Sequence, residues 1–457
     1  MFDPKHLLSD EQMKEFSANG YTVLKVGLPG EFHEEVYRKT EEVFESEGNP
    51  GNNILPRVPE IQTVFDQPEV QGAFSSILGP DYTMHIHRHP HINKPHSKHG
   101  GWHKDSYWGY RKVRYHRNRW AMAFYYPQDV TIQNGPTAVI PHTHYYADRL
   151  DNLDELGVPV CGEAGTIAIV HFDIWHRSTA NNTDKNRYMM KFQFTRMSEP
   201  EQPSWNNQEE SWHGNGIGDK HEIIWSQMWD WAAGRRPDED KTLDNAELAT
   251  SIEAPDESTR LNAAYGLAKL GEDAIPDLLN ALKGDNEAAQ LDAAYALSAG
   301  GEAAVEDLQA ALKHDSDTVR GHAAFALGDM GPSARESVSA LAGALNDKSE
   351  WVRHHVAEAL GTISVNPEVA VPALSRALED GDDQVRYNAA YSLARFGPEA
   401  EEAVPALAEA LNDENRYASG HSAVALQCIG TPQATELLLN HLTTSRWCPI
   451  TTKENMY

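Results

Sequence analysis

The sequence has few cysteines and a shortage of positive charge. The 457-residue chain contains three cysteines, Cys161, Cys428 and Cys448, which lie far apart and form no metal-binding knuckle. This odd, scattered set excludes a disulfide framework and suits a reducing compartment. The chain has 39 Lys and Arg against 68 Asp and Glu, a formal net charge of −29. We therefore expect no nucleic-acid partner, because phosphates are bound by clustered Lys and Arg.

Long apolar runs are also missing. No stretch approaches the roughly 20 apolar residues that span a bilayer, and residues 1–10 contain neither a basic region nor the apolar core of a secretory signal. We therefore expect a cytoplasmic protein with no membrane partner. The chain is 40% apolar and 23% charged, which is the composition of a folded protein. Its length favours two domains of about 200 residues each.

The second half of the sequence repeats a pair of small residues followed by a leucine. The leucines of the six copies are Leu267, Leu297, Leu327, Leu360, Leu393 and Leu426. Their spacing of 30 to 33 residues accommodates two short helices and their turns. A second apolar stretch, such as residues 275–279, follows a Gly-containing turn and supplies the second helix. The pattern resembles HEAT-like repeats and predicts an all-α solenoid of about six repeats.

Three of these repeats contain a Val-Arg step, with the arginines at Arg320, Arg353 and Arg386. A row of arginines could bind a ligand. However, an aspartate opens helices nearby, at Asp317, Asp347 and Asp383. We therefore interpret the arginines as structural and expect them to cap helices and to pair within their own repeat.

The first half has a different pattern. Residues 9–12 read as a capping box that opens a helix, and Gly20 ends this helix before an apolar strand at 21–24. A charged helix is predicted over 31–47. After Asp81 the chain consists of short alternating runs broken by Gly, Pro and Asn, which is typical of a β-sandwich or jelly roll.

These patterns predict the domain organisation. We expect a jelly-roll domain over 1–236, an acidic linker over 237–257, the HEAT-like solenoid over 258–445 and a C-terminal tail over 446–457. Five tryptophans lie between residues 199 and 236. They either pack the closing helix of the first domain and its junction with the solenoid, or form a lid over a site.

Three residues have the character of metal ligands. His103 and Asp105 are two positions apart, so in an extended segment their side chains project to the same side. His176 lies on a predicted late strand and is the best third ligand. Two histidines and one carboxylate on one face of an ion leave open positions, as in non-haem Fe(II) oxygenases. Such positions can take a bidentate 2-oxo acid and O₂.

Arg187 is the candidate anchor for a dicarboxylate co-substrate such as 2-oxoglutarate. Residues 181–186 are rich in turn formers, so His176 and Arg187 are expected on two strands of one hairpin. The second strand alternates Arg187, Met189, Lys191 and Gln193 with aromatic and apolar residues, which predicts a polar face toward a barrel interior. An arginine can bind a carboxylate with two parallel hydrogen bonds.

The spacing His103-x-Asp105, His176 and Arg187 resembles the phytanoyl-CoA dioxygenase family of 2-oxoglutarate oxygenases. Further matches are the residues 8–12, the turn and strand at 134–141, and Ser178. The resemblance spans about residues 8–197. It implies a double-stranded β-helix with flanking helices that holds Fe(II) through the two histidines and the aspartate.

The resemblance also implies a co-substrate pocket and a reaction. It places Arg187 and Ser178 at the distal carboxylate of 2-oxoglutarate, with Asn93 and Trp120 lining the same pocket. Related halogenases lack the carboxylate ligand, so Asp105 favours a hydroxylase that uses O₂. Residues 141–144, Pro-His-Thr-His, depart from the family's usual Pro-Gly-Ser-His. This departure puts the rim of the pocket in doubt, so a substrate cannot be transferred from a relative.

The expected function is hydroxylation of an aliphatic C–H bond in a small-molecule substrate. The candidate substrate wall comprises His91, Tyr107 and Trp108. We also expect a basic surface near the mouth of the site. Its residues are Arg111, Lys112, Arg114, Arg117 and Arg119.

Other functions remain open. The HEAT repeats could bind a protein partner, mediate assembly or support the barrel. Alternatives are a HEAT scaffold with an inactive oxygenase domain, a side-chain hydroxylase whose protein substrate the repeats recruit, and a metal-dependent hydrolase or isomerase on the same barrel.

Overall fold

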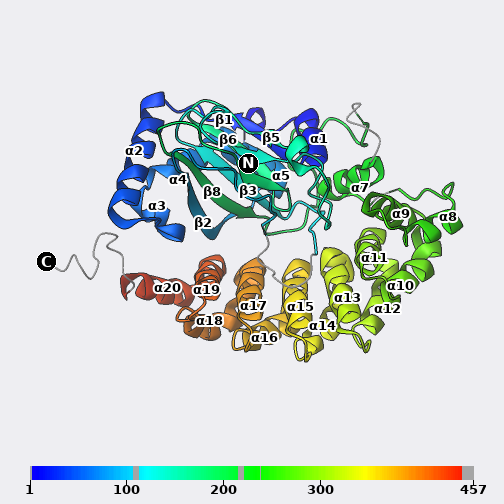
Figure 1. The fold of residues 1–457 in the computed structure, drawn as a ribbon. Coiled ribbons are helices and arrows are strands. Elements are labelled where there is room, and N and C mark those ends of the chain that lie inside the picture. The colour runs from blue at the N-terminus through cyan, green and yellow to red at the C-terminus, as the bar shows by residue number, and fades with distance from the viewer. Residues whose placement is uncertain (1–2, 106–112, 215–220, 237, 445–457) are drawn as a thin grey trace. The chain divides into compact units, whose positions relative to one another are not determined.

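The computed structural model describes residues 3–105, 113–214, 221–236 and 238–444 (Figure 1). Tyr107, Trp108, Arg111 and Lys112 lie outside these residues. The chain divides into two compact units. One comprises Met1–Asp219 and Met228–Arg235, and the other comprises Lys220–Gln227 and Arg236–Tyr457.

The first unit contains two antiparallel sheets. The larger sheet has the strand order β1-β6-β3-β8-β2 and the smaller sheet has the order β5-β4-β7. The larger sheet comprises β1 (Tyr21–Lys25), β6 (Thr166–His171), β3 (Trp120–Tyr126), β8 (Arg187–Thr195) and β2 (Thr83–Asn93). The smaller comprises β5 (Val158–Pro159), β4 (Thr137–Val139) and β7 (His176–Ser178). Neighbouring strands of the larger sheet are distant in sequence, and together the two antiparallel sheets form the predicted jelly roll.

Strand β8 has two chemically different faces, as its alternation predicts. Tyr188, Phe192 and Phe194 on one face contact aromatic rings of flanking helices. Arg187, Lys191 and Gln193 on the other face are buried as well. A buried polar face beside an outward aromatic face places polar groups inside the jelly roll.

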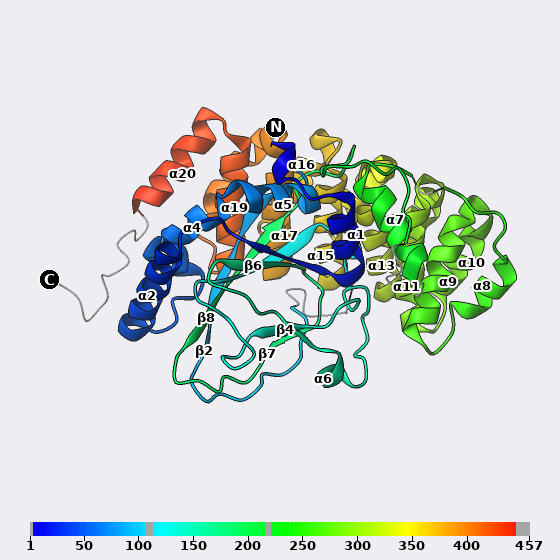
Figure 2. The same cartoon turned by 90° about the horizontal axis from the view of Figure 1, so that it is seen from above.

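The flanking helices of the first unit cover the outer face of the larger sheet (Figures 1 and 2). Tyr37 and Phe44 of α2 lie against Tyr188, while Phe65 of α4 and Phe74 of α5 lie against the phenylalanines of β8. The helices of this layer are α1 (Asp10–Asn19), α2 (Gly30–Glu47), α3 (Ile54–Arg57), α4 (Glu60–Phe65) and α5 (Pro68–Leu78). Helix α6 (Leu153–Leu156) lies elsewhere, and its Leu153 packs with Ala138 of the smaller sheet.

Helix α1 begins and ends as the sequence predicts. Ser9 Oγ accepts from Gln12 N, and the Gln12 side chain accepts from Ser9 N, which completes the capping box. Gly20 ends the helix with φ of 76°. A Cβ atom at Gly20 would lie 2.5 Å from His144 Nδ1, so the position requires glycine.

The tryptophans of segment 199–236 are buried. Within the first unit, Trp229 contacts Trp205 and Trp212 edge to face, with ring centroids 4.9 and 5.9 Å apart. Trp229 and Trp231 lie on α7 (Glu222–Ala232), which belongs partly to each compact unit. These contacts place Trp205, Trp212 and Trp229 in the core of the first unit.

The second unit is built from successive helix pairs (Figure 2). In each pair the small-residue helix packs against the corresponding helix of the next repeat, through residues such as Ala293, Ala324 and Ala357. The helices are α8 (Asn245–Ser251), α9 (Glu257–Lys269), α10 (Ile275–Lys283), α11 (Glu287–Gly300), α12 (Val305–Ala311), α13 (Asp317–Asp329), α14 (Val338–Ala344), α15 (Glu350–Ile363), α16 (Pro367–Ala377), α17 (Asp383–Phe396), α18 (Val404–Ala410), α19 (Arg416–Ile429) and α20 (Pro432–Thr444). Helix α8 lies within 237–257, the segment predicted as a linker. Within the described ranges, none of the helices has the length and apolar character to span a bilayer.

The arginines of the repeats pair differently from the prediction. Arg353 donates to both carboxylate oxygens of Asp380, at 2.7 and 2.8 Å, and to the backbone oxygen of Asp347 at 2.8 Å. The same pattern joins Arg320 to Asp347 and Arg386 to Asp413. Each carboxylate therefore comes from the turn that opens the next repeat, 27 residues on, whereas the arginine's own turn supplies only a carbonyl. We call these pairs the Arg–Asp ladder.

Candidate metal centre

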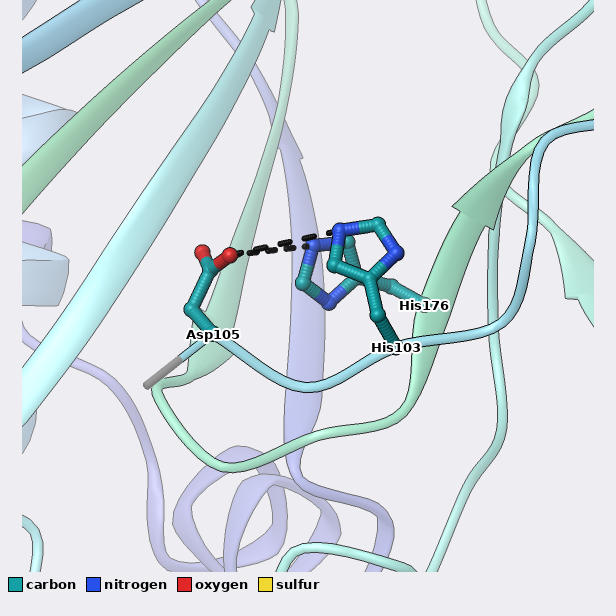
Figure 3. A group of neighbouring side chains, drawn as sticks. All are labelled: His103, Asp105 and His176. Carbon is teal, nitrogen blue, oxygen red and sulfur yellow. Dashed lines mark ion pairs between the residues drawn. The ribbon is translucent and has the colours of Figure 1, made fainter. Parts of the chain in front are cut away.

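The backbone brings the two candidate histidines side by side. His103 N donates to His176 O at 3.1 Å, and His176 N donates to His103 O at 2.9 Å, so the His103 segment forms a bridge with the first residue of β7. Directly paired residues of an antiparallel bridge point to the same side. The two imidazole rings accordingly lie with centroids 4.4 Å apart. Asp105 follows two residues later and projects toward the same rings (Figure 3).

The ligand atoms converge on one point. Asp105 Oδ1 lies 4.0 Å from His103 Nε2 and 3.9 Å from His176 Nε2. All three ligand atoms are within 4.8 Å of one another, and among the described residues this is the group of His, Cys, Asp and Glu side chains able to hold an ion. Two atoms bonded to one ion at about 2.1 Å are at most about 4.2 Å apart. Both carboxylate-to-imidazole distances fall within that limit.

Carbonyl oxygens fix the orientation of both imidazoles. His103 Nδ1 lies 3.0 Å from Gly101 O, and His176 Nδ1 lies 3.1 Å from Ile174 O. Because a carbonyl can only accept, each Nδ1 carries the proton and each Nε2 presents its lone pair to the centre. Burial lowers the pKa of His176 to about 4, which keeps this imidazole neutral, the form that binds metal ions.

Lys191 of β8 holds the other oxygen of Asp105. Lys191 Nζ donates to Asp105 Oδ2 at 2.6 Å, and both side chains are largely buried. Burial alone would raise the pKa of Asp105, but the positive charge of Lys191 and its hydrogen bond outweigh burial and hold the pKa well below its usual range. Asp105 is therefore an ionised ligand, and Oδ1 is the oxygen left to face the imidazoles.

Arg187 is a buried cation with an unused donor. It is 1% exposed, its Nε donates to Gly135 O at 2.8 Å, and its guanidinium lies 5.9 Å from the centroid of the Tyr126 ring. Its buried NH1 group has no hydrogen-bond partner among the described residues. Burial lowers the pKa of Arg187. A buried guanidinium with a free donor fits a carboxylate ligand, which supplies both charge and acceptors.

Asn93 and Ser178 lie near the same end of the barrel. Asn93 pairs with Arg187 across the sheet, and its Nδ2 donates to Gly135 O at 3.0 Å and Thr179 O at 2.8 Å. Its Oδ1 accepts from Ser97 Oγ. Both ends of this amide are thus in use, which favours a role in positioning Gly135, the residue that orients Arg187. Ser178 on β7 accepts from Gly100 N through its backbone. Contact of either residue with 2-oxoglutarate stays a prediction.

The structure corrects the placement of Trp120. Trp120 begins β3 and pairs with Thr195, whereas Tyr126, which lies beside Arg187, ends the same strand. Six residues of strand separate them by about 20 Å. Trp120 is therefore at the opposite end of the barrel from Arg187. Tyr126, which sequence reasoning did not select, occupies the predicted place of Trp120.

The predicted basic surface is wrong for Arg114 and Arg119, whereas Arg111 and Lys112 lie outside the described residues. Arg114 is buried and donates to Asp173 at 2.8 Å, and Arg119 is buried and donates to Glu199 at 2.7 Å. Arg117 and Arg119 lie over the ring of Trp231. Arg114 and Arg119 pair with acids from distant segments, partners that local sequence did not reveal.

His91 of the candidate substrate wall lies near the metal centre. It pairs with Met189 across β2 and β8. Burial lowers its pKa well below the usual value, and Lys191, Asp105 and His176 are close enough to contribute to the shift. Its buried Nε2 has no partner among the described residues. Lys191 and Gln193 were predicted on the inner face of β8, but sequence reasoning assigned neither a contact.

Two families match different parts of the chain. Residues 5–189 match the family model of phytanoyl-CoA dioxygenase (PhyH). Residues 245–320, 305–394 and 371–447 match the model of HEAT repeats. No curated protein sequence matches the chain.

Several solved structures are similar to part of this chain. EctD from S. alaskensis, solved with 2-oxoglutarate and 5-hydroxyectoine, is 18% identical, with 43% of this chain and 80% of that chain covered and a TM-score of 0.37. The non-heme alpha ketoglutarate dependent carbocyclase SnoK from nogalamycin biosynthesis is 18% identical, with coverage of 43% and 88% and a TM-score of 0.36. The apo form of the non-heme monooxygenase ThoJ is 17% identical, with coverage of 43% and 84% and a TM-score of 0.35.

Proposed function

We propose that this protein hydroxylates an aliphatic C–H bond of a small molecule. Its residues 5–189 form a domain of the phytanoyl-CoA dioxygenase family of Fe(II)- and 2-oxoglutarate-dependent oxygenases, and its C-terminal half consists of HEAT repeats. The observation that carries the proposal is the convergence of His103, Asp105 and His176 inside a barrel that also buries Arg187.

The residues present fit Fe(II) and 2-oxoglutarate. Two imidazoles and one carboxylate form the donor set that non-haem iron(II) oxygenases use. The free NH1 group of Arg187 would hold the distal carboxylate of 2-oxoglutarate. When bound, iron with 2-oxoglutarate supplies oxidative chemistry: O₂ is consumed, one oxygen atom enters the substrate C–H bond and the other enters succinate as CO₂ leaves.

The remaining residues position these groups. Gly101 O and Ile174 O direct Nε2 of both histidines to the centre, and Lys191 leaves Oδ1 of Asp105 for it. A single carboxylate oxygen and two imidazoles on one face leave the opposite positions for the co-substrate and O₂. The carboxylate of Asp105 also supports hydroxylation over halogenation, which in this class of enzymes needs that position vacant for chloride.

The HEAT repeats supply a surface of the kind that binds other proteins. Its role here is partner binding, assembly or support of the oxygenase domain, and the oxygenase chemistry needs none of its residues. A small molecule remains the proposed substrate.

The test combines spectroscopy with product analysis. The anaerobic full-length protein is mixed with Fe(II) and 2-oxoglutarate, and we expect a charge-transfer absorption band and, on admission of O₂, succinate. Arg187→Met should weaken 2-oxoglutarate binding by at least about 100-fold, because a charged hydrogen-bond pair is lost. Zinc should still bind to this variant, since the three ligands are unchanged. Absence of both the band and succinate from the unaltered protein would overturn the proposal.

A further inference from the structure

Two polar side chains on the inner face of β8 are buried without partners. Gln193 and Thr195 are both 0% exposed. In the part of the chain that the structure describes, the amide oxygen and nitrogen of Gln193 have no hydrogen-bond partner, and the hydroxyl of Thr195 has none either. Burying such groups unpaired costs free energy, so natural proteins retain them mainly where a ligand or water completes them.

The register of the larger sheet places these groups inside the barrel. Gln193 pairs with Met122 of β3, and Thr195 pairs with Trp120. Lys191, two residues earlier on β8, donates to the metal-centre carboxylate of Asp105. Residues two apart on a strand share a face. Gln193 and Thr195 therefore lie on the same face of β8 as Lys191, which is the face toward the metal centre.

The sequence of β8 fixes the order of the polar side chains along its inner face. At about 3.3 Å per residue, Arg187 lies about 13 Å from Lys191 in one direction, and Gln193 lies about 7 Å from it in the other. The co-substrate that joins Arg187 to the metal centre therefore occupies the Arg187 side. The Gln193 side is left for the molecule that is oxidised.

The surroundings of the pair are apolar and aromatic. The Trp120 ring lies 5.3 Å from the His85 ring and 6.0 Å from the Phe172 ring, measured between centroids. Met122 stands opposite Gln193. Lys191 already shares its charge with Asp105. The inner face of β8 thus offers an amide and a hydroxyl near aromatic rings, and its nearest described cation, Lys191, is already paired with Asp105.

We propose that Gln193 and Thr195 select the substrate, and that this substrate is an uncharged, partly apolar small molecule with a carboxamide-like or hydroxyl group that donates and accepts hydrogen bonds. A plain hydrocarbon chain would leave the buried amide unpaired, and an ionised carboxylate would lose its hydration beside two neutral side chains. The inference deepens the proposed function and rests on it, because the order along β8 assumes that the metal and co-substrate bind at the triad and Arg187.

The first experiment separates the inference from the proposed function. Full-length protein is titrated with Zn(II), a diamagnetic substitute for iron, and then with 2-oxoglutarate. Calorimetry measures the affinity for each of the two ligands. Failure at this stage overturns the proposed function. If both bind, ligand-observed NMR on the loaded protein compares carboxamides on straight, branched and cyclic frames with the matching carboxylates and hydrocarbons.

We expect at least one carboxamide to bind more tightly than its carboxylate and hydrocarbon counterparts. Gln193→Met keeps the length and removes the amide, and it should weaken that binding about tenfold while leaving zinc and 2-oxoglutarate binding unchanged. Thr195→Val should weaken it severalfold. Gln71→Met on α5 is the matched control and should change nothing. Equal binding of the carboxamide, the carboxylate and the hydrocarbon, no carboxamide binding, or an unchanged affinity in Gln193→Met would overturn the inference.

A second readout does not depend on any ligand. If the Gln193 amide is unpaired until a substrate binds, Gln193→Met removes an unpaired buried group. The midpoint of thermal unfolding of the ligand-free protein should then stay the same or rise. If the amide instead has a structural role, the midpoint should fall. A lower midpoint would therefore also contradict the inference.

Discussion

At the scale of single residues, Lys191 determines the electrostatics of the metal centre before any ion binds. Its ammonium lies 2.6 Å from Asp105 Oδ2 and is the cation that compensates this mostly buried carboxylate. The imidazole of His176, which burial keeps neutral, cannot supply that charge. An ion at the centre would share the compensation, so the need for Lys191 should differ between the metal-free and metal-loaded protein.

Replacing Lys191 tests this difference. Lys191→Met should lower the free energy of unfolding of the metal-free protein by about 2 to 3 kcal/mol, because it leaves a buried carboxylate unpaired. Saturating Zn(II) should restore most of the loss. The double variant Lys191→Met/Asp105→Asn should regain stability without metal but respond little to Zn(II). Chemical denaturation with and without Zn(II) measures all three, and equal losses in the two conditions would contradict the prediction.

The residues of the site show what sequence can reveal. His103, Asp105 and His176 were predictable because the spacing of the first two fixes their common side and the third lies in a strand that pairs with them. Trp120 was misplaced, because its position relative to Arg187 depends on strand register. The pairing of Arg119 was missed because its partner, Glu199, is 80 residues away and nothing in the local pattern marks it.

At the scale of elements, the Arg–Asp ladder ties each repeat of the solenoid to the next. The repeat period predicted the helix pairs, but the sequence offers each arginine an aspartate on either side. The helix geometry decides between them. Arg353, for example, reaches the side chain of Asp380 in the following turn and takes only the carbonyl of Asp347 from its own.

Removing one rung should destabilise the solenoid. Arg353→Met should lower its free energy of unfolding by about 2 kcal/mol, because Asp380 loses two charged hydrogen bonds in a largely buried place. In the double variant Arg353→Met/Asp380→Asn the loss should be smaller than the sum of the single losses by at least about 1 kcal/mol. Arg376→Met, at an exposed position of α16, is the control. Additive losses in urea unfolding would contradict the ladder's role.

The solenoid should also lose stability in mild acid. His354 and His421 are buried, and burial lowers the pKa of each to about 3. Between pH 6.5 and 3 the unfolded chain therefore binds more protons than the folded one, so stability falls as pH falls below 6.5. Each histidine contributes up to about 1.4 kcal/mol per pH unit.

His421→Leu isolates one of these contributions. The free energy of unfolding of this variant should depend less steeply on pH between 6.5 and 5 than that of the unaltered protein, whatever the stability of the variant at pH 8. Thermal unfolding across this range measures the slopes. Equal slopes would show that His421 is not buried as a neutral group.

At the scale of the whole molecule, the two compact units have separate tasks. The three candidate ligands, Arg187 and the inner face of β8 all belong to the first unit, and the Arg–Asp ladder belongs wholly to the second. The composition and the change of repeat pattern predicted two domains. They did not predict that α7 would be divided between the units, because a helix rich in tryptophan can pack on either side.

This division predicts how ligands affect unfolding. Zn(II) with 2-oxoglutarate binds the folded first unit, so at about 100 times the dissociation constant it should stabilise that unit by about 2.7 kcal/mol and raise the midpoint of one calorimetric transition. Arg353→Met should lower the midpoint of the other transition and leave the ligand-induced shift unchanged. His176→Ala should abolish the shift without altering the solenoid transition. A single transition that both the ligands and Arg353→Met displace would instead show that the two units unfold as one cooperative body.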